Sequence, residues 1–67
     1  GQIPSLHTVS LKVYDVLGRE VATLVNEAMM PGRYQVTFDA GNLASGTYFY
    51  RLQSGTSVAV KKLMILK

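Results

Sequence analysis

Residues 8–26, TVSLKVYDVLGREVATLVN, hold two runs of β-favouring residues on either side of a short turn. In the first run apolar and polar residues alternate, which predicts a half-buried strand over residues 8–15. Gly18 suits the left-handed position of a tight hairpin with a bulge. The return run predicts a strand over residues 19–26, and its broken alternation predicts a bulge near Ala22–Thr23.

The remainder of the chain continues the period-two pattern, and no stretch of it requires a helix. Three further strands are predicted, over residues 33–39, 47–53 and 57–66. Pro31-Gly32 suits the centre of a type II turn, in which the glycine takes a positive φ. Because short strands joined mostly by turns are typical of an all-β antiparallel sandwich, we expect residues 1–67 to form one such domain.

The final predicted strand has two arrangements that fit its pattern. Val58 and Val60 share one phase of the alternation, whereas Leu63 and Ile65 share the other. A bulge between the two pairs would bring all four side chains to one face of the sheet. Alternatively, the second half of the strand is covered on both faces.

Composition indicates a small domain that has no covalent or metal cross-link. Of the 67 residues, 48% are hydrophobic and 16% are charged, which is typical of a globular core and not of a disordered linker. A domain of this size buries only about 60% of the surface of its unfolded chain, so we expect marginal stability. The chain has no cysteine and one histidine, which excludes disulfides and a structural zinc site.

Charge and hydropathy exclude two classes of partner. The net charge is +3, and the chain lacks the basic stripe with stacking aromatic residues that is typical of nucleic-acid-binding proteins. No stretch reaches the roughly 18 apolar residues that a membrane-spanning helix needs. We therefore expect no nucleic-acid partner and no transmembrane helix.

No residue pattern indicates catalysis, a cofactor or a metal ion. The single histidine, His7, lies in a predicted loop without a nucleophile in an activating context. The four carboxylates lie at strand ends or turns, where turn formation explains them better than an acid–base pair or a calcium site does. They are Asp15, Glu20, Glu27 and Asp39. We expect no catalytic, cofactor-binding or metal-binding residue, and no enzyme activity.

Leu43, Gly46 and Tyr48 form an L-x-x-G-x-Y pattern at the start of a predicted strand. In immunoglobulin-like sandwiches, a tyrosine at such a corner turns its hydroxyl back to the backbone a few residues upstream. This contact would satisfy a buried hydroxyl and fix the preceding crossover. We expect Tyr48 to form such a corner; the alternative is that it only fills the core.

Two further groups of residues have both a structural and a functional explanation. Lys61, Lys62 and Lys67 gather at the end of the sequence. They either protect an edge strand from unwanted pairing or mark a strand that another protein recognises. Met29-Met30 is either an adaptable contact patch or a pair of which one side chain packs inward.

Three stretches carry a more specific signal in combination: VSLKVYDVLGREVATLVNE, PGRYQVTFDAGNLASGTYFYRLQSG and a final KKLMILK. Over residues 8–67 they resemble the type A C-terminal sorting domain of the type IX secretion system of Bacteroidetes-type bacteria. The shared fold-defining positions are Gly18 in the hairpin, the Pro31-Gly32 turn, and Leu43, Gly46 and Tyr48. The immunoglobulin-like domain of the flagellar hook-capping protein has a similar hairpin and is a near neighbour.

The resemblance implies a small immunoglobulin-like β-sandwich that follows a cargo domain in a secreted protein. The outer-membrane translocon would recognise the sandwich as an export signal, and a sortase-like peptidase would usually then remove it. Lys61, Lys62 and Lys67 match the basic last strand of the family, which implies a role in translocon recognition. The implied location is secreted or on the cell surface, by way of the periplasm of a Gram-negative bacterium.

Two departures from the family pattern affect these expectations. Residues 1–8 replace the opening strand of the family, so the first strand is missing or cut. The edge bared in this way favours a homodimer or a strand swap. Met29-Met30 stands where the family is more polar. The alternative function is a structural or adhesive immunoglobulin-like module, including the flagellar hook-cap type; the absence of tryptophan disfavours carbohydrate binding.

Overall fold

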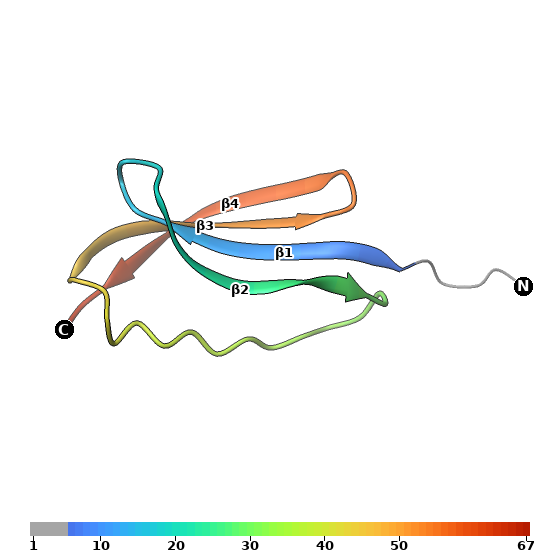
Figure 1. Cartoon of the computed structure of the whole chain (residues 1–67), viewed down its shortest axis with the longest axis horizontal. Coiled ribbons are helices and arrows are strands. Elements are labelled where there is room, and N and C mark those ends of the chain that lie inside the picture. The colour runs from blue at the N-terminus through green and yellow to red at the C-terminus, as the bar shows by residue number, and fades with distance from the viewer. Residues whose placement is uncertain (1–5) are drawn as a thin grey trace, which may run out of the picture.

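Four antiparallel strands form a single sheet in the computed structural model, which describes residues 6–67. They are β1 (His7–Tyr14), β2 (Glu20–Met29), β3 (Gly46–Ser54) and β4 (Ser57–Ile65). The order β2-β1-β3-β4 places β2 and β4 at the two edges of the sheet (Figure 1). No helix is present within residues 6–67, so the all-β prediction is confirmed, and the architecture is consistent with an immunoglobulin-like sandwich. The prediction of a missing first strand rests mainly on residues 1–5, which lie outside the described residues.

Strand β2 contains two bulges where the sequence analysis expected one. Its register against β1 shifts at Leu24 and again at Val21, and not between Ala22 and Thr23. Strict alternation would point Val21 and Leu24 to opposite faces, because they are three positions apart. With both bulges in place, the two side chains pack against the same buried core. The expected location near Ala22–Thr23 is therefore confirmed, but the bulges are two and lie on either side of that pair.

The strand predicted over residues 33–39 is wrong. These residues have no regular secondary structure, and no backbone–backbone hydrogen bond joins them to another described residue. The connection from β2 to β3 instead lies over one face of the sheet, where Phe38, Ala40 and Leu43 pack against the core. A segment on the face of a sheet cannot join its ladder, because inter-strand hydrogen bonds lie in the plane of the sheet. We call the covered side the inner face and the opposite side the outer face.

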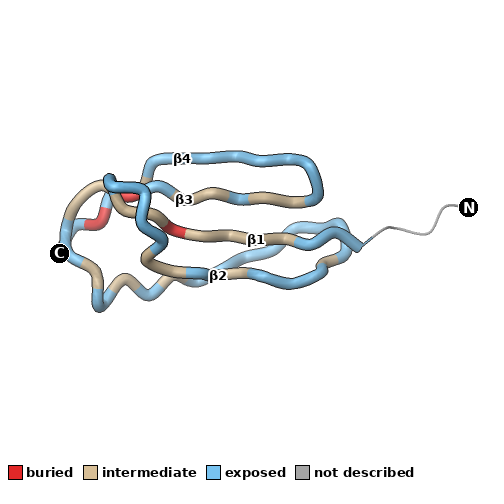
Figure 2. Tube along the Cα trace, turned by 45° about the horizontal axis from the view of Figure 1, so that its top comes forward, coloured by how far each residue is buried: buried red, intermediate tan, exposed pale blue. Residues whose placement is uncertain are grey.

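The buried core lies at one end of the sheet. Val13 is fully buried, and Tyr48 and Ile65 are 8% and 7% exposed; no other residue of the described chain is buried to this degree. They come from the end of β1, the start of β3 and the end of β4, which meet at one end of the molecule (Figure 2). Away from this end, the described residues are only half-buried or exposed.

Candidate recognition surface

The three lysines of the predicted recognition set do not form one cluster. In the β3–β4 ladder, Lys61 lies opposite Tyr50, which packs against the core from the inner face. The next residue, Lys62, lies opposite Phe49. Because neighbouring residues of a strand point to opposite faces, Lys61 belongs to the inner face and Lys62 to the outer face. Lys67 lies beyond the end of β4.

Lys67 is held by the connection that enters β3. Its backbone N–H donates a hydrogen bond to the Ser45 hydroxyl oxygen at 3.0 Å, and its Nζ donates to the carbonyl oxygen of Gly41 at 2.8 Å. Both of its donors therefore contact the same connection, which packs on the inner face. Lys67 contributes to the fold, and its ammonium group is already engaged.

Lys62 lies among exposed apolar side chains on the outer face. Val60 and Met64 are two positions away on β4, and Phe49 lies opposite on β3. Val58 extends this row along the edge strand. The exposed fractions are 49% for Val58, 57% for Val60, 53% for Met64 and 36% for Phe49. We call these four residues together with Lys62 the outer-face patch.

This patch was not expected from the sequence, because both predicted arrangements of the last strand are wrong. Strand β4 pairs with β3 over its whole length without a register shift, so no bulge is present. Val58 and Val60 stay exposed on the outer face, whereas Leu63 and Ile65 point to the inner face. No described segment covers the outer face at these positions, so the distal half is not enclosed on both sides either (Figure 1). One feature of the sequence does indicate the patch. Val58 and Val60 alternate in the opposite phase to Leu63 and Ile65, so a regular strand places the two pairs on opposite faces.

Tyr48 forms a corner at the start of β3. Its hydroxyl donates a hydrogen bond to the carbonyl oxygen of Ala44, four residues upstream, at 2.8 Å. Gly46, between them, has φ at 152°, a conformation that side chains rarely adopt, and no heavy atom lies within 4 Å of the position of a Cβ there. The Leu43 N–H donates to the carbonyl oxygen of Ala40 at 3.0 Å and closes a turn before the corner. These contacts fix the path of the chain into β3.

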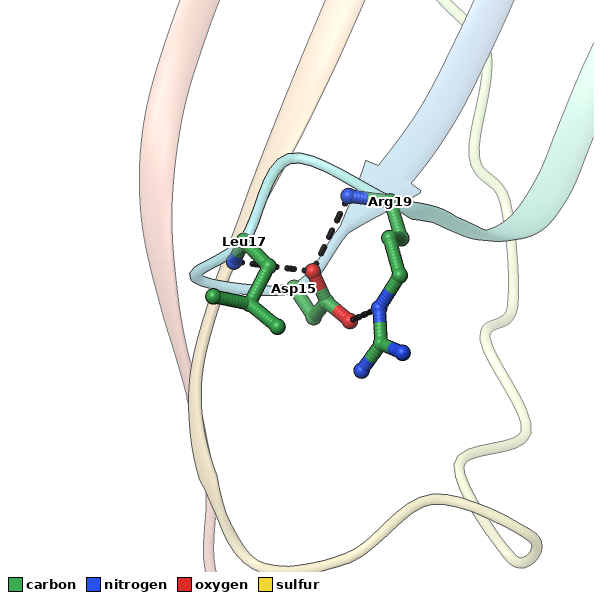
Figure 3. A network of polar contacts seen from close by, with 3 residues as sticks. All are labelled: Asp15, Leu17 and Arg19. Atoms are coloured by element: carbon green, nitrogen blue, oxygen red, sulfur yellow. Dashed lines mark hydrogen bonds and ion pairs between the residues drawn. The ribbon is translucent and has the colours of Figure 1, made fainter.

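The β1–β2 hairpin is held by one carboxylate. Asp15 Oδ1 accepts hydrogen bonds from the backbone N–H groups of Leu17 and Arg19, both at 2.9 Å, and Asp15 Oδ2 accepts from Arg19 Nε at 2.7 Å (Figure 3). Gly18 takes φ of 81° in this turn, as a tight hairpin requires. The hydrogen bonds, chiefly that from the backbone of Arg19, lower the pKa of Asp15 against the opposing effect of burial.

The expected type II turn at Pro31-Gly32 is wrong, because Gly32 does not have a positive φ. The turn is instead closed by a side chain: the Tyr34 hydroxyl donates a hydrogen bond to the carbonyl oxygen of Met30 at 2.6 Å. The Tyr34 ring lies 3.6 Å from the position that a Cβ of Gly32 would occupy. A Cβ at position 32 would therefore make only an ordinary van der Waals contact with the ring.

Both methionines before this turn border an apolar groove on the inner face. Met29 is half-buried, whereas Met30 is 44% exposed. The groove has a volume of about 520 Å³ and runs between the β2–β3 connection and the sheet. Val36 and Tyr34 line it from the connection, and Leu52 lines it from β3. The connection therefore covers the inner face only loosely.

The titratable residues are dispersed over the molecule. Glu20 forms an ion pair with Lys12 at 3.0 Å, and Asp39 accepts a hydrogen bond from the Gly41 N–H at 2.9 Å. Within residues 6–67, no group of three or more His, Cys, Asp or Glu side chains is placed to hold a metal ion. None of the described segments is a helix of the length and hydropathy needed to cross a membrane. Asp15, Glu20 and Asp39 thus act in turns and strand contacts.

Comparison with known proteins relates this chain to one family of domains. The family described as "Secretion system C-terminal sorting domain" matches residues 2–66, which is nearly the whole chain. Neither the curated proteins nor the solved structures give a significant match.

Proposed function

The chain belongs to the family of secretion system C-terminal sorting domains, and on this basis we propose that residues 1–67 act as one folded export signal. The family serves type IX secretion and is of a non-catalytic kind. Membership implies a preceding cargo domain, handling by the secretion machinery, and export across the outer membrane toward the cell surface or the medium. It also favours a sorting function over a structural or adhesive module.

The proposed recognition element is the outer-face patch. The observation that supports it is the position of Lys62, exposed between Val60 and Met64 and opposite Phe49 on an edge strand. Exposed apolar side chains grouped in this way are typical of interaction sites. A lysine among them adds attraction to an acidic group and fixes the register of the partner. We expect the translocon component to present an apolar surface with a carboxylate opposite Lys62.

The other two lysines would contribute less directly. Lys61 lies on the opposite face of the same strand, so it would contact the partner only if a partner strand added to the β4 edge. Lys67 donates its hydrogen bonds within the domain and would act by holding the connection in place. The order of importance for recognition is then Lys62, Lys61 and Lys67.

Export of a reporter from a cell with type IX secretion tests this proposal. The 67-residue chain is fused behind a periplasm-directed reporter, and Lys62→Ala is combined with Val60→Thr, which keeps the β-branched shape. Both residues are exposed, so each change should cost less than about 0.5 kcal/mol of stability. We expect the variant to fold, shown by circular dichroism, and to remain in the periplasm.

Two controls complete that experiment. Lys61→Ala makes the same change in charge on the other face of β4 and should retain most of the export. Val16→Thr makes the same substitution as Val60→Thr at a residue of the hairpin turn that is 66% exposed. This variant should be exported as well as the unchanged chain. Normal export of the folded Lys62→Ala, Val60→Thr variant would show that the outer-face patch is not recognised.

The remaining steps belong to the same proposal. The cargo would reach the translocon by way of the periplasm, and a sortase-like peptidase would remove the domain after export. The mass of the exported reporter measures the second step directly: removal predicts a reporter without the sorting domain in the medium and an intact fusion in cells without the peptidase.

A further inference from the structure

Three stretches of backbone have an open edge among the described residues. Two are the edge strands β2 and β4. The third is the segment 33–39, RYQVTFD, which lies over the inner face without a backbone hydrogen bond to another described residue. Unpaired N–H and C=O groups along such an edge favour pairing with another chain. The three edges differ in how well they are protected from it.

The two edges of the sheet carry features that oppose self-pairing. Strand β2 is interrupted by bulges at Val21 and Leu24, and bulges disturb an edge as a template. Strand β4 has Lys61 at its centre and Lys62 beside it. Two copies of β4 in antiparallel register about that centre would place Lys61 opposite Lys61, and like charges at opposing positions are destabilising.

The segment 33–39 has neither kind of protection, and its sequence is complementary to itself. In antiparallel register about Val36, Arg33 of each copy lies opposite Asp39 of the other. Tyr34 lies opposite Phe38 in the same register. Opposite charges, paired aromatic side chains and paired β-branched side chains are the combinations that stabilise neighbouring strands.

We propose that two copies of this chain associate through residues 33–39, paired as antiparallel strands about a two-fold axis at Val36. The axis makes the interface isologous, so each favourable contact between unlike residues occurs twice. Arg33 and Asp39 are exposed, and neither forms an ion pair within the described chain. The hydrogen bond from the Gly41 N–H engages Oδ1 of Asp39, which leaves Oδ2 to pair with the second copy.

Exposure along the segment supports the same interface. Tyr34, Val36 and Phe38 face the sheet, since the first two line the groove of about 520 Å³ and the third packs against the core. Tyr34 is nevertheless 57% exposed and Val36 is 40% exposed. A second strand beside them would cover this apolar surface and would supply partners for the unpaired backbone. The pair would form a small second sheet over the inner faces of both copies.

Exchange of the paired charges tests the interface by sedimentation equilibrium. Arg33→Asp places two carboxylates opposite each other at both ends of the pair, so the dissociation constant of the dimer should rise by about tenfold or more. Asp39→Arg should do the same with two cations. The double variant restores both pairs with reversed sign and should bring the constant back to within about threefold of the original. Arg51→Asp, opposite Lys12 on the outer face, makes the same charge change and should leave the constant unaltered.

Cysteine substitution provides a readout that does not depend on charge. The chain has no cysteine, so Val36→Cys introduces a single thiol at the proposed axis. It should form a disulfide-linked dimer on mild oxidation, faster than Lys61→Cys, which reports on pairing through β4. A monomer at millimolar concentration, a dimer that the double charge exchange fails to restore, or faster cross-linking at position 61 would each overturn the proposal. None of these results depends on export, so the proposed sorting function is tested separately.

Discussion

The ammonium group of Lys67 lies 2.8 Å from the carbonyl oxygen of Gly41, to which it donates a hydrogen bond, and this contact joins residues 26 positions apart. A second bond, from the Lys67 N–H to the Ser45 hydroxyl, ties the end of β4 to the same connection. The region that would be recognised and the connection that covers the inner face are therefore mechanically linked.

Lys67→Ala should lower the free energy of unfolding by about 0.5–1 kcal/mol, because it removes the bond to Gly41 and keeps the backbone bond to Ser45. Urea denaturation measures the difference. Lys62→Ala is the matched control, since the Lys62 side chain makes no hydrogen bond or ion pair with another described residue. Equal losses for the two variants would mean that the Lys67–Gly41 contact does not stabilise the fold.

Tyr48→Phe should cost about 1–3 kcal/mol, because it removes a part-buried hydrogen bond made by a tyrosine that is only 8% exposed. Tyr34→Phe is a close control: its hydroxyl also donates to a carbonyl four residues upstream, but Tyr34 is 57% exposed. Water can replace that bond, so the loss should be smaller. The corner would have no special energetic role if both variants melted at the same urea concentration.

Acid should weaken the hairpin through Asp15. Its pKa is lowered in the folded state, so its contribution to stability is fully present above the ordinary carboxyl value of about 3.9 and is lost as the pH falls through the lowered value. Asp15→Asn should remove this part of the pH dependence in unfolding curves recorded across the acid range. Arg19→Ala keeps the backbone N–H that is the main cause of the shift, so it should remove less. A larger effect of Arg19→Ala would contradict the assignment.

Val13→Ala should cost about 2 kcal/mol or more, because Val13 is fully buried and the lost methyl groups leave a cavity. Val60→Ala removes the same atoms from a side chain that is 57% exposed and should cost about 0.5 kcal/mol or less. In so small a domain the first change could abolish folding, which thermal melting monitored by circular dichroism would detect. Equal melting temperatures for the two variants would contradict the placement of Val13 in the buried core.

Local sequence patterns were enough to predict features whose residues lie close together in the sequence. The alternation in residues 8–15 and the glycine at position 18 predict β1 and its hairpin, and β1 indeed runs over His7–Tyr14. The L-x-x-G-x-Y pattern likewise predicts the contact of Tyr48 with the upstream backbone, because all of its members lie within six positions.

Features that depend on distant residues were predicted less well. Residues 33–39 alternate as cleanly as a strand, but a strand also needs a neighbour in its plane, which a pattern within the segment does not reveal. The contact of Lys67 with Gly41 is equally remote from any local signal. The placement of Lys61 and Lys62 on opposite faces is a different case, because neighbouring residues of a strand always point to opposite faces. It was predictable from the sequence, but the lysines were treated as one group because of their charge.

Burial is concentrated around Val13, Tyr48 and Ile65, so the end of the molecule that holds them is well packed. We call it the firm end, and we call the loosely packed opposite end the soft end. The β3–β4 turn, the start of β1 and the end of β2 all lie at the soft end, where local opening should require little free energy and amide hydrogens should exchange first. The cargo domain that family membership implies would precede β1, whose start lies at this end. Tension on the cargo would therefore peel the sheet from its soft end, while the residues nearest Ile65 kept their contacts longest.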